Sequence, residues 1–261
     1  MNFINTIVMG IVEGITEFLP VSSTGHLIIT KSLLQFKIND AFEVFIQMGA
    51  ILAVVLAYWP RFMGLLKWNQ SEGFSGLKGV GFLALTSVPA LLLGFLIHGF
   101  IKEKLFNNVT VAAGLAVGGL WILLAERFLK ARNRTSLDEM TWKQALAIGF
   151  FQCFALWPGM SRSSSTILGA MLMGLDRKSA TEYSFFAAVP VLLAAGFFDL
   201  LDNLDQLSSS DLGLFGLGFV VSFLSAWIAI QWLIRFVSRH NLMPFGWYRL
   251  VIAAVILIWM R

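Results

Sequence analysis

Long apolar stretches, separated by short polar segments, run along the whole chain. A helix of about 20 residues spans the hydrocarbon core of a bilayer. Six stretches approach or exceed this length, and they cover roughly residues 41–59, 79–101, 109–129, 180–201, 212–236 and 244–260. The pattern predicts an all-α polytopic membrane protein with about six transmembrane helices, in a single membrane domain that covers residues 1–261.

Two further apolar stretches are interrupted by proline. Residues 3–18 are followed by Pro20 and a run of hydroxyl side chains, and then by a short apolar piece at 27–34. Residues 142–157 are likewise followed by Pro158 and a second run of hydroxyls. Irregular backbone at membrane depth is tolerated only inside protein or beside a wet cavity. We therefore expect two re-entrant helical hairpins that are buried in the bundle.

The two hairpins also indicate an internal repeat. A constant offset of 139 residues places Gly10 on Gly149, Glu13 on Gln152, Phe18 on Trp157, Ser22 on Ser161, and Glu43 on Glu182. If each half has one hairpin, which does not cross the membrane, and three full spans, the chain crosses three times in the first half. The second half then starts on the opposite side of the membrane. The halves, about 1–135 and 140–261, would then form an inverted-topology repeat, as in many transporters.

Composition supports a membrane environment. The chain is 57% hydrophobic and 13% charged, whereas charged residues make up about a quarter of an ordinary soluble domain. The net charge of +4 is modest, and basic residues in a membrane protein mainly set orientation, so we expect no nucleic-acid partner. The single cysteine, Cys153, excludes an intrachain disulfide and a thiolate metal cluster.

The basic residues predict the orientation in the membrane. Most of them fall in loops on one side of this topology: Arg61, Lys67, Lys78, Arg127, Lys130, Arg132, Arg134, Lys143, Arg177, Lys178, Arg235 and Arg239. The other side has Lys31, Lys37, Lys102, Lys104 and Arg261. Because cytoplasmic loops are enriched in Lys and Arg, the first side is expected to be cytoplasmic and both chain ends to face outward.

Two carboxylates open the polar run of the first hairpin. Glu13 and Glu17 are four residues apart and share one face of a helix, where like charges repel unless they are neutralised. A hard divalent cation, Mg²⁺ or Ca²⁺, would bind carboxylate and phosphate oxygens there. The alternative is that both acids stay protonated at membrane depth. We favour the metal site because the pair adjoins a phosphate-type loop.

The hydroxyls after Pro20 favour an anion site. Ser22, Ser23 and Thr24 lie where a new helix would begin, and free N–H groups and the helix dipole attract phosphate there. For any one of them taken alone, an N-cap or turn role is the more common one. His26 follows closely and can act as acid, base or nucleophile near neutral pH.

Arg162 is the most informative single residue. A guanidinium inside an apolar bundle is costly unless it is paired, and its planar fork suits phosphate oxygens. The alternative is a buried salt bridge, with four candidate partners: Glu13, Glu17, Glu43 and Glu182. We favour phosphate because Ser161, Ser163 and Thr166 lie beside Arg162 and would add hydroxyl donors.

The motifs resemble those of one known family. The run Glu13-x-x-x-Glu17-Phe-Leu-Pro-Val-Ser-Ser-Thr-Gly-His26, together with Pro158-Gly-Met-Ser-Arg162-Ser-x-x-Thr166, is similar to the undecaprenyl-diphosphate phosphatase family of the bacitracin-resistance type. The resemblance extends over essentially the whole chain, including the end Pro244-Phe-Gly-Trp-Tyr-Arg249. One departure is the pair Ser164-Ser165, where the family pattern has Gly-Ala.

The resemblance implies a function. A member of this family removes the terminal phosphate from undecaprenyl diphosphate, which recycles the lipid carrier of cell-wall synthesis and gives bacitracin resistance. It also implies a site on the outer side of the bacterial cytoplasmic membrane, and Ser23 rather than its neighbours as the reacting hydroxyl.

The residues can supply what phosphoryl transfer needs, namely charge neutralisation, a nucleophile and proton transfer. Arg162 and the helix starts would hold phosphate oxygens, and Glu13 and Glu17 a metal. Ser23, His26 and water stay open as the nucleophile. Glu43 and Glu182 are expected only as supporting residues, which line the cavity, pair with Arg162 or lie at the interface. Gln152 takes the repeat position of Glu13 without its charge, which predicts one asymmetric site.

Two other functions remain open at the level of the sequence. Inverted repeats with broken helices are also typical of a lipid-phosphate flippase or other transporter. A non-catalytic membrane assembly protein is the second alternative. The residues do not determine the oligomeric state, so a homodimer stays open as well.

Overall fold

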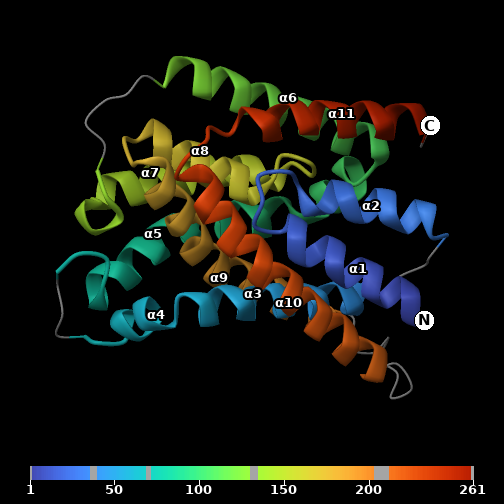
Figure 1. Cartoon of the computed structure of the whole chain (residues 1–261), viewed down its shortest axis with the longest axis horizontal. Coiled ribbons are helices and arrows are strands. Elements are labelled where there is room, and N and C mark those ends of the chain that lie inside the picture. The colour runs from blue at the N-terminus through green and yellow to red at the C-terminus, as the bar shows by residue number, and fades with distance from the viewer. Residues whose placement is uncertain (1, 36–39, 69–71, 130–134, 203–211, 260–261) are drawn as a thin grey trace.

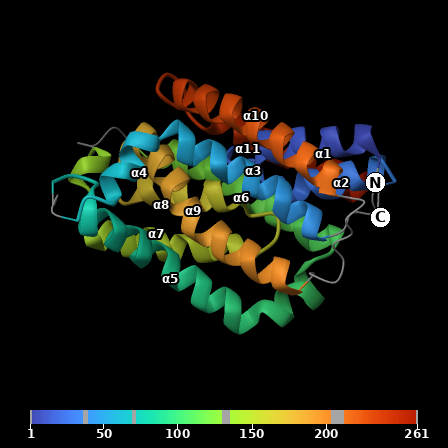
Figure 2. The same cartoon turned by 90° about the horizontal axis from the view of Figure 1, so that it is seen from below.

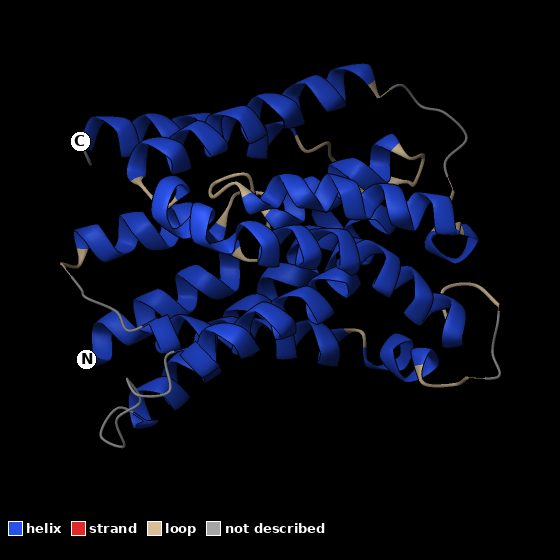
Figure 3. Ribbon diagram, turned by 180° about the vertical axis from the view of Figure 1, so that it is seen from behind, coloured by secondary structure: helices blue, strands red, loops and turns tan. Residues whose placement is uncertain are grey.

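The structure is a computed structural model, which describes residues 2–35, 40–68, 72–129, 135–202 and 212–259. These residues are helical apart from loops and one isolated bridge between Thr135 and Leu175, and they contain no strand (Figure 3). Some of the loop charges used to predict the orientation lie outside the described residues: Lys37, Lys130, Arg132, Arg134 and Arg261.

The helices follow one another in the order drawn in Figure 1. Their bounds are α1 Phe3–Thr16, α2 Ser23–Leu33, α3 Asp40–Ala57, α4 Trp59–Leu65, α5 Gly76–Phe100, η1 Ile101–Leu105, α6 Asn108–Phe128, η2 Leu137–Glu139, α7 Trp142–Cys153, η3 Phe154–Leu156, α8 Arg162–Leu172, α9 Arg177–Asp202, α10 Leu212–Val237 and α11 Met243–Trp259. Each of the six predicted spans falls on helix.

Four helices among the described residues are long and apolar enough to cross a membrane: Gly76–Leu105, Asn108–Phe128, Arg177–Asp199 and Leu212–Val237. A fifth span would be the pair α3 and α4, which is bent by 84°. The bend follows Tyr58, and Pro60 lies at the start of α4, where a missing N–H is tolerated. The remaining apolar helices, α1 and α11, are shorter. The protein is therefore a multi-pass membrane protein.

The two interrupted stretches have the same local design. The offset of 139 residues relates the start of α1 to that of α7, and it relates both ends of α2 to both ends of α8. The helices break after Thr16 and after Leu156. The second helix of each hairpin begins at the residue directly after a serine N-cap, Ser22 or Ser161.

Each hairpin packs mainly against a helix from the other half of the chain. Helix α1 lies along α10, and a Cβ on Gly14 would come within 2.3 Å of the Ser222 carbonyl oxygen. Helix α7 lies along α5, where a Cβ on Gly149 would come within 2.8 Å of the Leu85 carbonyl oxygen. The glycines let the backbones approach closely, as small residues do between membrane helices. Figure 2 shows α5 and α10 on opposite edges of the bundle.

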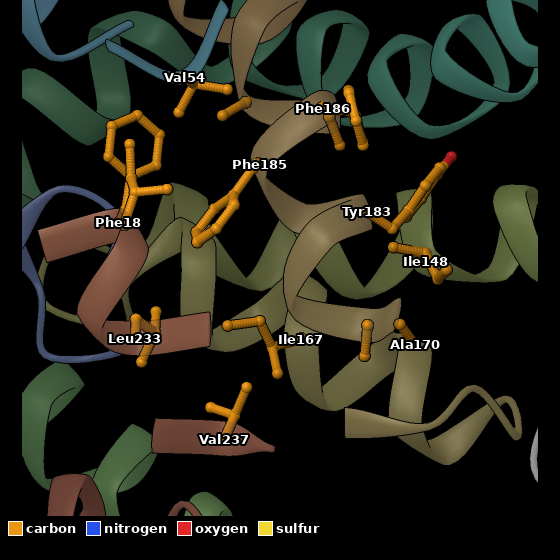
Figure 4. Packing of buried hydrophobic residues seen from close by; sticks show 14 of the residues in the cluster. Phe18, Val54, Ile148, Ile167, Ala170, Tyr183, Phe185, Phe186, Leu233 and Val237 are labelled. Atoms are coloured by element: carbon orange, nitrogen blue, oxygen red, sulfur yellow. The ribbon is translucent and has the colours of Figure 1, made fainter. Parts of the chain in front are cut away.

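The main core connects the first break to α9. Phe18 is fully buried, and its ring meets the edge of Phe185 at 5.5 Å between centroids (Figure 4). Leu233 and Val237 of α10 lie on another side of this cluster. The outer surface is apolar too, since Phe95 and Leu96 on α5 are each 76% exposed. A large exposed apolar surface of this kind fits contact with lipid.

Candidate active site

Both helix breaks bend at a serine with unusual backbone geometry. Ser22 and Ser161 have φ angles of 73° and 70°. Residues other than glycine rarely adopt such positive φ angles, and those that do are enriched at functional sites. Each serine caps the following helix, because its Oγ accepts from the N–H of Gly25 (3.5 Å) or of Ser164 (3.2 Å). The breaks thus present two helix N-termini, which are suited to bind anions.

Arg249 of α11 holds the two breaks together. Its side chain is fully buried. Nη2 donates to the carbonyl oxygens of Gly159 and Met160 at 2.8 Å each, and Nη1 donates to that of Pro20 at 3.4 Å. Carbonyls that the helix breaks leave free are therefore satisfied by one guanidinium. These contacts give Arg249 a structural role, because they link the backbone of the first break to that of the second.

Glu17 connects the reactive groups of the two hairpins. Its Oε1 accepts from Nη2 of Arg162 at 2.9 Å, and its Oε2 accepts from the hydroxyl of Ser23 at 2.6 Å. Both side chains of the ion pair are buried, with 10% of Arg162 and 6% of Glu17 exposed. The buried salt bridge that was the alternative for Arg162 is therefore present, and Glu17 is the partner among the four candidates.

Arg162 has further contacts and one free donor. Nη1 donates to the carbonyl oxygen and the hydroxyl of Ser184 on α9, at 3.1 and 3.3 Å. The guanidinium also lies over the ring of Phe18, 5.6 Å from its centroid. Nε is buried and has no hydrogen-bond partner. An unpartnered donor on a buried guanidinium fits a bound oxyanion beside the ion pair.

The hydroxyls of the second hairpin mostly hold the fold. Ser163 donates to the carbonyl oxygen of Leu19 at 2.7 Å, which joins the two breaks, and Ser161 contacts Ser163 at 3.0 Å. Thr166 contacts the carbonyl oxygen of Arg162 at 2.9 Å and the hydroxyl of Ser184 at 2.6 Å. In the first hairpin, Thr24 is half-buried beside Ser23.

The ring of His26 is held from both sides. Nδ1 lies 2.7 Å from the carbonyl oxygen of Ser22, and Nε2 lies 2.7 Å from the hydroxyl of Tyr248 on α11. A carbonyl can only accept, so Nδ1 carries the proton in the neutral ring. Nε2 then carries the lone pair of the ring, which accepts from the Tyr248 hydroxyl and can take up a proton once that hydroxyl moves away.

Glu13 meets some of the requirements for a metal ligand, but it lacks enough neighbouring protein ligands among the described residues. It is 2% exposed, and its Oε2 is buried without a partner. Carboxylate oxygens suit Mg²⁺ or Ca²⁺, and the second lone pairs on the Glu17 oxygens leave it able to ligate as well. Within the part of the chain that the structure describes, no group of three or more His, Cys, Asp or Glu side chains could hold a metal ion. A cation on Glu13 and Glu17 would therefore need oxygens from substrate or water.

The supporting residues lie in different surroundings. Glu43 forms an ion pair with Lys31. Glu182 pairs with Lys178 at 3.9 Å, one turn away on α9. Neither pair involves Arg162. Gln152 donates from Nε2 to the carbonyl oxygen of Thr86 at 3.0 Å, and its Oε1 is buried without a partner, at the repeat position of the partnerless Glu13 oxygen.

Two residues that contact the site were not predicted as site residues from the sequence. Ser184 contacts Arg162, but it lies in an ordinary apolar stretch, and no local pattern indicates it. Tyr248 contacts His26 and precedes Arg249 at the end of the chain, where an aromatic residue resembles an interfacial anchor. The adjacent intramembrane arginine was the available signal that α11 enters the site.

Comparison with known proteins gives one consistent result. Residues 6–255 match the family model described as "Bacitracin resistance protein BacA". The chain is 53% identical over 252 residues to the undecaprenyl-diphosphatase of Maridesulfovibrio salexigens, with 96% of each chain covered. It is 48% identical to that of Lawsonia intracellularis (96% and 95% covered) and 47% identical to that of Acidovorax ebreus (96% and 92% covered).

Proposed function

The chain belongs to the family of the bacitracin resistance protein BacA, and we propose that it is an integral membrane undecaprenyl-diphosphate phosphatase. It removes the terminal phosphate from the lipid diphosphate and yields the monophosphate carrier and inorganic phosphate. Relatives named undecaprenyl-diphosphatase align with nearly the full length of the chain. As the family name indicates, loss of this activity should raise sensitivity to bacitracin.

The observation that carries this proposal is the double contact of Glu17. One carboxylate accepts from Ser23 at 2.6 Å and from Arg162 at 2.9 Å. A hydroxyl nucleophile, a proton acceptor and an oxyanion-binding guanidinium therefore meet at one point of an otherwise apolar bundle. Phosphoryl transfer requires this combination of positioning and charge stabilisation.

The geometry supports Ser23 as the nucleophile. Its Oγ would bond to the terminal phosphorus while the bond from phosphorus to the bridging oxygen breaks, and the Ser23 proton would pass to Glu17 Oε2. Undecaprenyl phosphate leaves in this step. Water then attacks the phosphoserine and gives a proton to His26 Nε2. The bond from phosphorus to Oγ breaks, inorganic phosphate is released, and Ser23 regains its proton from Glu17. His26 then gives the proton that it took from water to bulk solvent, which returns its ring to the neutral form.

Arg162 and the two helix N-termini stabilise the charge in both steps. The Arg162 Nε, which has no partner, would donate to a phosphoryl oxygen, and the N-terminal turns of α2 and α8 would offer backbone N–H groups. We place a divalent cation on Glu13 and Glu17, where it would neutralise charge on the diphosphate. The partnerless Oε2 of Glu13 supports this placement.

The membrane topology is part of the same proposal. We propose six spans and two re-entrant hairpins in an inverted repeat, with the site open to the outer side. The offset of 139 residues relates the starts of α1 and α7 and both ends of α2 and α8, which supports the repeat. The packing of α1 on α10 and of α7 on α5 supports it as well. Helix α1 begins and α11 ends at the same end of the molecule (Figures 1 and 2), as expected if both termini face outward. The prenyl tail would lie against the apolar helix surfaces within the bilayer.

The first test is release of inorganic phosphate from undecaprenyl diphosphate by the purified chain in detergent, with and without EDTA. We expect metal-dependent release by the wild type and loss of release in His26→Ala and Arg162→Ala. His98→Ala in α5 is the matched histidine control and should keep nearly full activity. Trapping of a ³²P-labelled phosphoserine would distinguish attack by Ser23 from direct attack by water.

A lipid-phosphate carrier is the second candidate, because the paired broken helices are also the design of transporters. It predicts no phosphate release by a well-folded wild type and movement of the lipid in sealed vesicles. Release of phosphate in detergent, where no compartments exist, would establish the hydrolytic activity independently of transport.

A further inference from the structure

The contact between Tyr248 and His26 joins the last helix of the chain to the first hairpin. The two residues are 222 positions apart, and the Tyr248 hydroxyl lies 2.7 Å from His26 Nε2. Their rings are also stacked, with centroids 5.5 Å apart and planes inclined by 11°. A hydrogen bond and a ring contact thus fix the imidazole from the same side.

The opposite edge of the imidazole determines what this contact does. Nδ1–H donates to the Ser22 carbonyl oxygen at 2.7 Å, so Nε2 of the neutral ring is the acceptor. The Tyr248 hydroxyl must then donate to Nε2. Its proton lies on the one lone pair with which His26 can act as a base, and the ring cannot turn without losing both bonds.

Helix α11 is itself anchored beside this contact. Arg249, the next residue after Tyr248, donates to the carbonyl oxygens of Pro20 and Gly159 in the two breaks. This anchoring fixes where the Tyr248 side chain leaves the helix. Tyr248 is 43% exposed, so protein does not enclose it on every side, and we expect its hydroxyl to turn away when a water molecule takes its place at Nε2.

We propose that Tyr248 is a positioning residue for His26, an inference that rests on the proposed phosphatase function. Its hydroxyl holds the imidazole at Nε2 in the resting enzyme, and it releases this nitrogen to the attacking water. Tyr248 touches neither the phosphate nor the metal in this role, and it acts only through His26.

Tyr248→Phe tests the role with a minimal change, because the ring and its stacking remain and only the hydroxyl is lost. For the full chain in detergent, we expect kcat to fall on the order of 10-fold, the upper range for one hydrogen bond, with KM changed less than about twofold. Tyr58→Phe removes a hydroxyl from another partly buried tyrosine, away from His26, and should keep kcat. An unchanged kcat in Tyr248→Phe would overturn the proposal.

A double-mutant cycle separates positioning from a general structural role. In the His26→Ala background, Tyr248→Phe should lower the residual activity less than about twofold, because the hydroxyl acts only through the imidazole. An equal loss in both backgrounds would show a structural role and overturn the proposal.

Imidazole ¹⁵N NMR of the same protein gives a readout that does not need turnover. Tyr248→Phe should move the Nε2 resonance of His26 and leave Nδ1 protonated, while a resonance that stays in place would contradict the contact. A wild type that releases no phosphate would overturn the phosphatase function itself, and the Nε2 resonance would still decide whether Tyr248 holds the ring.

Discussion

Glu17 and Arg162, which come from different hairpins and lie 145 residues apart in the chain, form a buried ion pair with 2.9 Å between Oε1 and Nη2. Two charges at membrane depth are stable only when paired. Each residue also makes a hydrogen bond outside the pair: Glu17 accepts from Ser23, and Arg162 donates to Ser184. The pair therefore keeps the site assembled before substrate arrives.

Arg162→Lys should reduce phosphate release on the order of 10²-fold, the loss seen when one transition-state donor is removed. Lysine keeps the charge, but its donors all lie on one nitrogen. It cannot reproduce the separate positions of Nη2 at Glu17, Nη1 at Ser184 and Nε, which has no partner and would face phosphate. The measurement is kcat in detergent, with the thermal unfolding midpoint as a control for folding. Near-normal turnover would mean that the arginine serves only as the counter-ion of Glu17.

Glu17→Gln should lower activity by orders of magnitude and weaken the dependence on divalent metal. The amide keeps the size of the side chain, but it loses the negative charge that pairs with Arg162. It also has only one oxygen, so it cannot accept from both Ser23 and Arg162. Activity titrated with Mg²⁺ and Ca²⁺ after EDTA treatment is the measurement. An unchanged metal titration would remove Glu17 from the ligand set.

Glu13→Gln should separate metal binding from fold stability. Its buried Oε2 has no partner, so a neutral amide should keep or raise the unfolding midpoint in EDTA, since a buried charge is costly. The rise of the midpoint on adding Mg²⁺ or Ca²⁺, expected for the wild type by mass action, should shrink in the variant. A variant with the full metal-induced rise would place the cation elsewhere.

The breaks were predictable from the sequence because their cause is local. Proline followed by hydroxyls ends one helix and caps the next, and both hairpins break where Pro20 and Pro158 predict. The partner of Arg162 was not predictable, because four glutamates were equally suitable in the sequence. Only the packing of one hairpin against the other determines that Glu17 lies next to Arg162. The same reason hides Ser184 and Tyr248, whose roles arise only when α9 and α11 pack on the breaks. The sharp turn into α4 was missed because the apolar pattern continues through Tyr58.

Asp138 should give a pH-dependent contact outside the spans. Arg61, whose Nη1 lies 2.7 Å from Oδ1, and the N–H of Phe74 hold the pKa of the Asp138 carboxyl below its ordinary value of about 4. The stabilisation is therefore present above that value and is lost as pH falls through the lower pKa of the folded state. We expect the hydrogen-exchange protection factor of the Phe74 amide to drop in this acid range. In Asp138→Asn it should no longer change across this acid range, because the amide does not titrate, and an equal acid-dependent drop in that variant would assign the effect to another group.

Gly118→Ala should impair the site without touching any reacting group. A Cβ at this position would lie 2.0 Å from Nη2 of Arg249, the atom that donates to the Gly159 and Met160 carbonyls. The guanidinium must then shift, and buried hydrogen bonds to a charged group, worth about 1.5–3 kcal/mol each, are weakened or lost. We expect a lower unfolding midpoint together with reduced turnover.

The matched control is Gly81→Ala in α5, where a Cβ would meet nothing within 4 Å. Alanine is favoured over glycine in a helix interior by roughly 0.5–1 kcal/mol, so this variant should unfold at the same or a higher temperature with unchanged turnover. If both glycine variants behaved alike, helix propensity would explain the result. A loss of turnover confined to Gly118→Ala would be caused by the displaced Arg249 side chain. It would show that the contacts of α11 with the two breaks are needed for phosphate release.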